Sequence, residues 1–159
     1  MAAVLASMVM AVGGAVAVAG PAQADTVLRV EIVNDGTNRC MVSTGIANYI
    51  RQGSCGTTAA RWNMTVRDDG SIIFSKQSEG LCVHAVWGSL DVLLLACNAT
   101  DGRQVWTWEG GAPGSQVLAN ETPWGPSCLR LSPYSVGDVR IRLADCANSL
   151  SEYFHARPV

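Results

Sequence analysis

Side chains that could bind a ligand gather in the second half of this 159-residue sequence. The polar, aromatic and apolar members of this group are His84, Trp87, Asp91, Leu95, Asn98, Gln104, Arg130 and Arg142. A tryptophan beside a carboxylate and an imidazole can stack on a sugar ring and hydrogen-bond to its hydroxyls. Two arginines can grip a carboxylate or a sulfate through paired hydrogen bonds. These residue types indicate binding chemistry.

The same residues allow other interpretations, which the sequence leaves open. Trp87 with Leu93 and Leu95 can form an exposed apolar patch of the kind that marks protein interfaces. Trp87 can also pack locally over one end of the fold. For the arginines, a solvated strand face whose charge is balanced by nearby carboxylates is the simpler interpretation.

Catalytic and metal-binding motifs do not occur in the sequence. It contains no GxSxG, HExxH or P-loop pattern, and neither His84 nor His155 is paired with a recognisable nucleophile. There is no CxxC pair, and the two histidines stand at no ligand spacing. A net charge of −2 gives no reason to expect nucleic-acid binding. The sequence therefore predicts a protein that is not an enzyme and uses no metal and no cofactor.

The N-terminal segment differs in composition from the rest of the chain. Residues 1–20 carry no charged side chain and are rich in Ala, Val, Met and Leu. Ala22-Gln23-Ala24 has the small-x-small form of a signal-peptidase site, so residues 1–24 are predicted to be a signal peptide cleaved before Asp25. An uncleaved anchor is the alternative, because about 20 apolar residues can span a bilayer. Cleavage would leave a secreted domain of residues 25–159 without a membrane segment.

All six cysteines lie after this leader. An exported chain meets an oxidising environment, so they are expected to form disulfides, although their connectivity is open at this point. Taken two by two along the chain they are separated by 15, 15 and 18 positions: Cys40 and Cys55, Cys82 and Cys97, Cys128 and Cys146. An aromatic residue follows each of these three sets of cysteines: Trp62, Trp106 and Phe154. Regular repetition of this size indicates stacked supersecondary units.

Short segments with β-strand patterns precede or lie within these groups. Residues 27–33, 71–75 and 115–119 are largely apolar, and 139–143 alternates apolar and charged residues as a half-buried strand does. Asp-Gly and Gly-Gly turn signals separate the segments. A propeller typically needs about four blades or more. Three repeats of about four strands each, spanning roughly 27–69, 70–111 and 112–156, therefore predict an all-β fold, a β-trefoil with a pseudo-threefold barrel.

The β-trefoil architecture also selects a disulfide connectivity. It favours pairing within each repeat, as Cys40–Cys55, Cys82–Cys97 and Cys128–Cys146. Each bridge then closes a short loop and contributes about 3 kcal/mol in the chain-entropy model. A sum of three such contributions is comparable to the whole stability of a small domain.

At this level of detail the chain resembles the ricin B-type lectins, β-trefoils with QxW repeats. The second repeat carries the resemblance in Cys82-Val-His, Val92-Leu-Leu-Leu-Ala-Cys97 and Gln104-Val-Trp106. The third repeat matches as Cys128-Leu-Arg, Ile141-Arg-Leu-Ala-Asp-Cys146 and Glu152-Tyr-Phe154, and the first as Cys40-Met-Val, Cys55 and Ala60-Arg-Trp62. The resemblance spans the chain from about Val27 to Phe154. It implies that the three repeated aromatic residues form a layer of the core.

The resemblance also says where a sugar would bind. A sugar-binding repeat of the family has an Asp two positions after its first cysteine, an aromatic residue near its second cysteine, and an amide before the QxW. Here the Asp positions hold Val42, His84 and Arg130. The stacking positions hold Gly53, Leu95 and Ala144, and the amide positions hold Ala59, Arg103 and Ser151. No repeat keeps the family's residues, and the first repeat offers almost no hydrogen-bonding groups.

These observations together predict a secreted, monomeric, non-catalytic β-trefoil. By resemblance its ligand is a glycan or polysaccharide, bound at a rearranged site in the second repeat. The alternative partner is a secreted protein, for a protein-interaction or inhibitor trefoil that has lost sugar binding. An enzyme with an unrecognised site is the third and least favoured interpretation.

Overall fold

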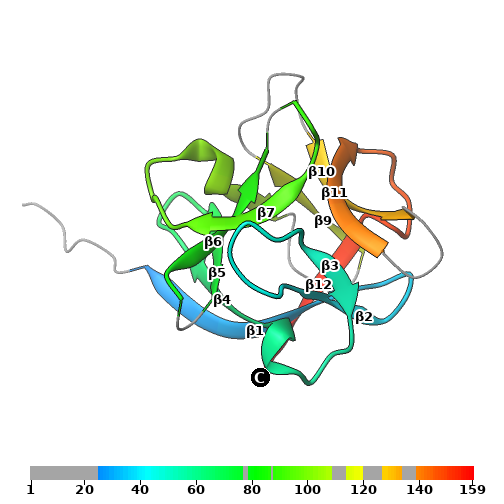
Figure 1. Cartoon of the computed structure of the whole chain (residues 1–159), viewed down its shortest axis with the longest axis horizontal. Coiled ribbons are helices and arrows are strands. Elements are labelled where there is room, and N and C mark those ends of the chain that lie inside the picture. Colours follow the sequence, from blue (N-terminus) through cyan, green and yellow to red (C-terminus); the bar gives the residue numbers. More distant parts are fainter. Residues whose placement is uncertain (1–24, 77–78, 87, 109–113, 120–126, 134–138) are drawn as a thin grey trace, which may run out of the picture.

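A computed structural model describes residues 25–76, 79–86, 88–108, 114–119, 127–133 and 139–159 (Figure 1). The predicted signal peptide lies outside the described residues. The first six strands are β1 (Thr26–Asn34), β2 (Arg39–Val42), β3 (Arg51–Gly53), β4 (Arg61–Val66), β5 (Ile72–Lys76) and β6 (Leu81–Ala85). The other six are β7 (Val92–Ala96), β8 (Trp106–Trp108), β9 (Ser115–Ala119), β10 (Ser127–Pro133), β11 (Val139–Asp145) and β12 (Tyr153–Pro158). Two 3-10 turns, η1 (Thr58–Ala60) and η2 (Gly102–Gln104), complete the elements, so the all-β prediction is confirmed.

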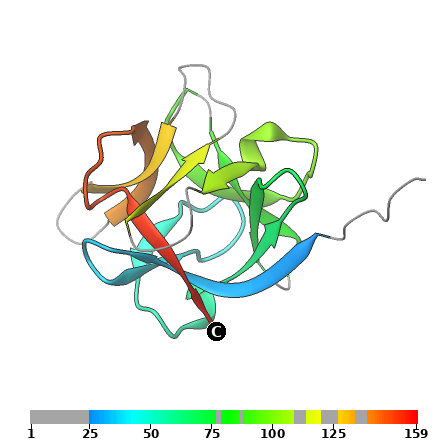
Figure 2. The same ribbon diagram turned by 180° about the vertical axis from the view of Figure 1, so that it is seen from behind.

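Six of these strands form a closed ring. β1 pairs with β4 and β12, β5 pairs with β4 and β8, and β9 pairs with β8 and β12, always antiparallel. Closure leaves the barrel without an open edge. The last strand lies beside the first, with Val30 opposite Pro158 and Asn34 opposite Phe154 (Figure 2). The two ends of the described chain therefore close the barrel.

The remaining six strands form three hairpins, β2–β3, β6–β7 and β10–β11. Backbone hydrogen bonds join each hairpin unit to the other two. Ile50 N–H, just before β3, donates to the Val92 carbonyl (3.0 Å), and Ile141 N–H donates to the Ile50 carbonyl (2.9 Å). Leu143 N–H donates to the Leu90 carbonyl (2.8 Å). Six barrel strands with three mutually contacting hairpins are consistent with the predicted β-trefoil (Figure 1).

The repeated aromatic residues lie in the core, as the resemblance implies. Trp62, Trp106 and Phe154 are each at most 1% exposed. The indole N–H of Trp62 donates to the Met41 carbonyl (2.9 Å), and that of Trp106 donates to the Val83 carbonyl (3.2 Å). Both carbonyls belong to the residue after the first cysteine of their repeat, so the two tryptophans pack in equivalent surroundings. The same core contains the other residues predicted to face inward: Met41, Val83, Val92, Leu94, Leu129, Ile141 and Leu143.

The three predicted disulfides are confirmed as Cys40–Cys55, Cys82–Cys97 and Cys128–Cys146. The first cysteine of each bridge is buried on its hairpin strand, and the second lies nearer the surface. Each bridge therefore joins the first strand of a hairpin to the residues that follow its second strand. Within the described ranges, no helix has the length and apolar character needed to cross a membrane.

Candidate functional site

The first repeat has no room at the positions where the lectin family binds sugar. Gly53 occupies the stacking position and lies against the side chain of Val42, which occupies the Asp position. A Cβ atom placed on Gly53 would come within 2.7 Å of Val42 Cγ2. This repeat therefore offers neither a carboxylate nor a stacking surface at those positions.

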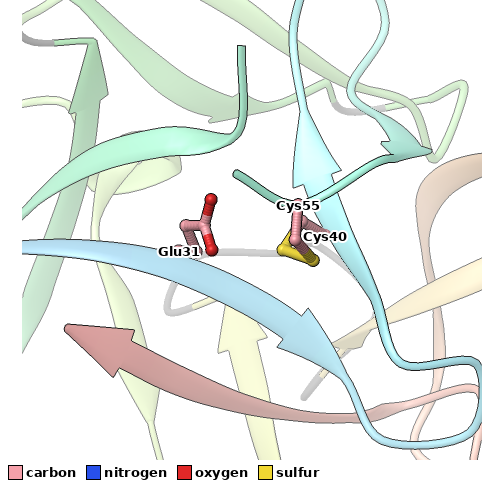
Figure 3. Close-up of side chains that lie close together, drawn as sticks. All are labelled: Glu31, Cys40 and Cys55. Atoms are coloured by element: carbon pink, nitrogen blue, oxygen red, sulfur yellow. A yellow bond between two sulfur atoms is a disulfide. The ribbon is translucent and has the colours of Figure 1, made fainter. Parts of the chain in front are cut away.

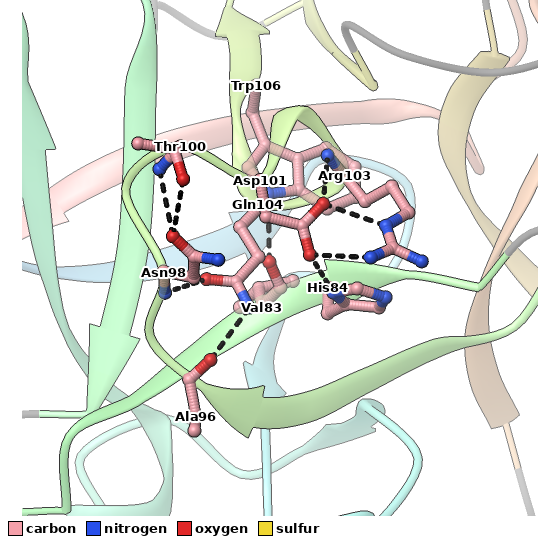
Figure 4. Close-up of polar contacts among 9 residues, drawn as sticks. All are labelled: Val83, His84, Ala96, Asn98, Thr100, Asp101, Arg103, Gln104 and Trp106. Carbon is pink, nitrogen blue, oxygen red and sulfur yellow. Dashed lines mark hydrogen bonds and ion pairs between the residues drawn. The ribbon is translucent and has the colours of Figure 1, made fainter.

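In the second repeat, the Asp position holds a buried histidine rather than a surface group. His84 lies on β6 and is 6% exposed, with its Nδ1 3.6 Å from Asp101 Oδ2 (Figure 4). Asp101 also accepts hydrogen bonds from the Nε (2.7 Å) and Nη2 (2.9 Å) of Arg103. Burial lowers the pKa of His84, although the Asp101 carboxylate opposes that effect. Hydrogen bonds from Arg103 lower the pKa of Asp101, so Asp101 and Arg103 form an ion pair beside the His84 ring.

Gln104 and Asn98 hold the turn that follows β7. Gln104 is 2% exposed; its Nε2 donates to the Ala96 carbonyl (2.9 Å), and its Oε1 accepts from Asn98 N–H (2.8 Å) (Figure 4). The Asn98 Oδ1 accepts from both the N–H (3.1 Å) and the hydroxyl (2.8 Å) of Thr100. The geometry gives both residues a role in positioning this turn. Their predicted role in ligand binding stays a prediction.

A side-chain oxygen binds the equivalent backbone N–H, just after the second cysteine, in each repeat. In the third repeat Glu152 replaces the glutamine, and its Oε2 accepts from Ala147 N–H (2.8 Å). In the first repeat Ala60 carries no such oxygen, and Glu31 of β1 accepts from Gly56 N–H instead (2.5 Å). The first repeat thus recovers the missing hydrogen bond from a different strand.

Glu31 also lies beside the first disulfide. One oxygen of Glu31 and the sulfurs of Cys40 and Cys55 all lie within 4.8 Å of one another (Figure 3). The sulfurs are bonded to each other, whereas thiolates are the form in which cysteine binds metals. The Glu31 carboxylate is engaged by Arg157 Nη2 at 2.5 Å as well as by Gly56. This cluster is therefore an ion pair packed on a disulfide.

A cavity of about 470 Å³ lies between the second and third repeats and includes two positions at which the resemblance expects a sugar. We call it the repeat-3 groove, and it is lined by Gly88, Leu90, Ser127, Arg130, Ala144 and Asp145. Arg130 holds the Asp position and Ala144 the stacking position of this repeat. Leu90 is 38% exposed and supplies an apolar wall, while Arg130 and Asp145 supply a cation and a carboxylate. Apolar surface with a few convergent polar groups is the usual composition of a ligand site.

The two predicted arginines have different surroundings. Arg130 and Arg142 lie opposite each other on β10 and β11, which places both on one face of the hairpin. Arg142 Nε is 3.2 Å from Asp91 Oδ1, and Arg142 Nη2 donates to the Ser89 carbonyl. Arg130 is 44% exposed, lines the groove, and has its Nε 3.8 Å from the buried Glu152. Arg142 and Asp91 therefore join the second and third repeats, and Arg130 faces the groove.

Of the three apolar residues predicted to form an interface, the structure describes Leu93 and Leu95. Trp87 lies outside the described residues. Leu93 pairs with His84 across the hairpin, Leu95 pairs with Cys82, and both leucines are half-buried. Leu90 is more exposed than either leucine and borders the repeat-3 groove.

Several residues of the groove carry no strong signal in the sequence. Asp145 could have been noticed, because it immediately precedes Cys146 within the family motif. Leu90 and Gly88 carry no motif. They line the groove because Leu90 bonds to Leu143 and because Asp91 forms a bridge with Arg142, contacts between residues far apart in the sequence.

Comparison with protein-family models and with curated protein sequences finds no match. Solved structures do share the fold. The designed threefold-symmetric protein ThreeFoil aligns with a TM-score of 0.70 at 13% identity, over 82% of this chain and 99% of that one. An exo-beta-1,3-galactanase from Clostridium thermocellum aligns with a TM-score of 0.68 at 15% identity, over 83% of this chain and 30% of the enzyme.

A cytolethal distending toxin structure from Actinobacillus actinomycetemcomitans is also similar. It aligns with a TM-score of 0.63 at 12% identity, over 82% of this chain and 90% of that one. At such low identities these similarities establish a shared fold and do not identify a ligand. The match to ThreeFoil agrees with the threefold arrangement of strands and hairpins.

Proposed function

We propose that this chain is a secreted, monomeric, non-catalytic β-trefoil similar to ricin B-type lectins, and that it binds a glycan or polysaccharide through the repeat-3 groove. One observation carries the proposal: a cavity is bordered by Arg130 and Ala144, which hold positions at which the resemblance expects a sugar. Three disulfides and a predicted signal peptide support export, because disulfides persist in oxidising compartments.

The groove has chemistry suited to a sugar ring. The apolar side chains of Leu90 and Ala144 cover a C–H face of the ring. The Asp145 carboxylate accepts hydrogen bonds from ring hydroxyls, and the Arg130 guanidinium donates to ring or hydroxyl oxygens. In this proposal Arg130 of the third repeat is the main polar contact, instead of His84 in the second.

The groove does not have the composition of a glycosidase site. Glycosidases generally use two carboxyl groups on either side of the scissile bond. Among the described residues that line the groove, Asp145 is the one carboxylate. The proposal is therefore binding without turnover.

A glycan array probed with residues 25–159 tests this function. Binding is expected for the unmodified domain and is expected to fall about tenfold or more in Arg130→Ala, because a charge-assisted hydrogen bond is lost. Ala144→Phe should close the groove and abolish binding. Arg39→Ala removes an exposed arginine of β2, remote from the groove, and is the matched control. Full binding by both groove variants would contradict the proposal.

The alternative is a protein-binding or inhibitor trefoil, and the exposed Leu90 favours it. In that case the array stays blank, and a secreted protein is captured by the domain but not by Leu90→Asp. Turnover of a glycoside or peptide by a homogeneous sample would contradict both functions.

A further inference from the structure

Lys76, the last residue of β5, is a buried cation away from the repeat-3 groove. It is 9% exposed, and its Nζ donates to the carbonyls of Ala59 (2.5 Å) and Arg61 (3.0 Å). The same ammonium lies 3.9 Å above the centre of the Trp62 ring. Among the described residues, these contacts use two of its three N–H groups, which leaves one for another acceptor.

No carboxylate of the described chain lies within ion-pair distance of this ammonium. Burial lowers the pKa of Lys76 to about 8, and the charge of Glu79 opposes the shift only in part. The charged groups near Lys76 are Arg61 of β4 and Glu79 in the turn after β5. Carbonyls and an aromatic ring do not neutralise a buried positive charge, so a bound anion would stabilise the protonated amine.

A cavity of about 380 Å³ opens beside this amine. We call it the lysine pocket, and the residues that matter for binding are Ser43, Thr44, Thr58, Arg61, Lys76 and Glu79. Two cations and three hydroxyl residues therefore face one space, with the exposed Glu79 also on its wall. The pocket includes Ala59 but neither Val42 nor Gly53, so it lies beside the closed sugar position of the first repeat.

We infer that the lysine pocket binds an anionic group of a carbohydrate, either a sulfate ester or a carboxylate. Lys76 and Arg61 would contribute charge-assisted hydrogen bonds, and the hydroxyls would complete the contacts to the oxyanion. The whole molecule does not attract anions, because its net charge is −2. Selectivity for an anion must therefore come from these local groups. The inference does not depend on the repeat-3 groove.

NMR titration of the 15N-labelled domain of residues 25–159 at pH 6.5 tests the inference. N-acetylglucosamine 6-sulfate probes the sulfate, glucuronate probes the carboxylate, and N-acetylglucosamine is the neutral control. Saturable shifts at the amides of Thr44, Thr58 and Lys76 are expected with one or both anionic sugars. The neutral sugar should not produce them.

Two substitutions connect the shifts to the pocket. Lys76→Met and Arg61→Gln are each expected to weaken binding about tenfold, whereas Arg39→Gln removes the same charge elsewhere and should leave it unchanged. Lys76 bonds to two carbonyls, so its variant is first checked for native amide dispersion. Arg61 is exposed on β4 and provides a second variant that should preserve the fold.

Either of two results would overturn the inference. One is the absence of saturable shifts at the pocket with both anionic sugars. The other is full affinity for the anionic sugar in both Lys76→Met and Arg61→Gln, whether or not Arg130→Ala weakens binding. In one form of this second result, Arg130→Ala is the variant that loses affinity. That last pattern would locate the anion in the repeat-3 groove, so failure of this inference and failure of the proposed function remain distinguishable.

Discussion

Glu31 provides a hydrogen-bond acceptor that Ala60, at the QxW position of the first repeat, cannot provide. Its carboxylate accepts from Gly56 N–H, the hydrogen bond that Gln104 and Glu152 accept in the second and third repeats. Glu31 is 2% exposed whereas Gly56 is exposed, so it is the buried carboxylate, more than the N–H, that depends on this hydrogen bond. The sequence did not reveal this replacement, because Glu31 lies 29 positions before Ala60, on a different strand.

Replacing Glu31 therefore tests this role at the residue scale. Glu31→Ala is expected to lower the free energy of unfolding by about 2 kcal/mol, because the buried carboxylate's hydrogen bonds from Arg157 and Gly56 are both lost. Glu31→Gln keeps an oxygen there and should cost less. Urea unfolding at pH 7 measures both, and Glu79→Ala, at an exposed carboxylate, should change stability by less than about 0.5 kcal/mol.

The same variants have a defined pH dependence. Burial alone would raise the pKa of Glu31, but hydrogen bonds from Arg157 and Gly56 and nearby arginine charges hold it below its usual value. A carboxylate with a lowered pKa stabilises the fold above its unfolded pKa, and this stability is lost as the pH falls through the folded value. The difference between the unmodified domain and Glu31→Gln should shrink between pH 7 and pH 3. A difference that grows on acidification would contradict the assignment.

At the scale of elements, the β2–β3 hairpin explains why the first repeat has no room for a sugar at the positions that the resemblance indicates. The side chain of Val42 fills the space above Gly53, where the family places a stacking residue. A residue with a Cβ atom at 53 would meet both methyl groups of Val42, at 2.7 and 2.8 Å. The two substitutions exclude the pocket together.

This close contact makes a double-mutant prediction. Gly53→Ala is expected to cost about 2 kcal/mol through overpacking, because the new methyl group meets the rigid, branched side chain of Val42. In a Val42→Ala background the same change should cost clearly less, giving a coupling energy of about 1 kcal/mol. Guanidinium unfolding of the four proteins measures this cycle. Additive effects would show that the hairpin relaxes without the Val42 contact.

The strands and disulfides could largely be predicted from the sequence, whereas the repeat-3 groove could not. The difference is whether the contacts lie within one repeat or between repeats. Cysteine spacing, alternating residues in 139–143 and repeated aromatics all reflect contacts within one repeat, which sequence periodicity records. The groove and the lysine pocket form between repeats. Lys76 belongs to the second repeat and caps carbonyls of the first, so no motif of either repeat indicates it.

At the scale of the whole molecule, stability depends on closing the barrel with its two ends. β12 pairs with β1 over five residue pairs from Val30–Pro158 to Asn34–Phe154, and it also pairs with β9. It carries Phe154, the third member of the aromatic layer, with 0% exposure. Among the described strands, β1 has no other partner on that side, and β9 has there only its two residue pairs with β10.

Removing β12 should therefore disrupt the fold as a whole. A chain ending at Glu152 leaves β1 and β9 with open edges and removes Phe154 from the core, a loss of about 3–5 kcal/mol for the aromatic ring alone. We expect loss of dispersed amide signals and of a cooperative thermal transition, even with all three disulfides formed. Deleting only Val159, which makes one backbone hydrogen bond to Arg29, is the control and should leave both intact. A cooperative transition in the chain that ends at Glu152 would show that the disulfide-linked hairpins, rather than barrel closure, determine the stability of this protein.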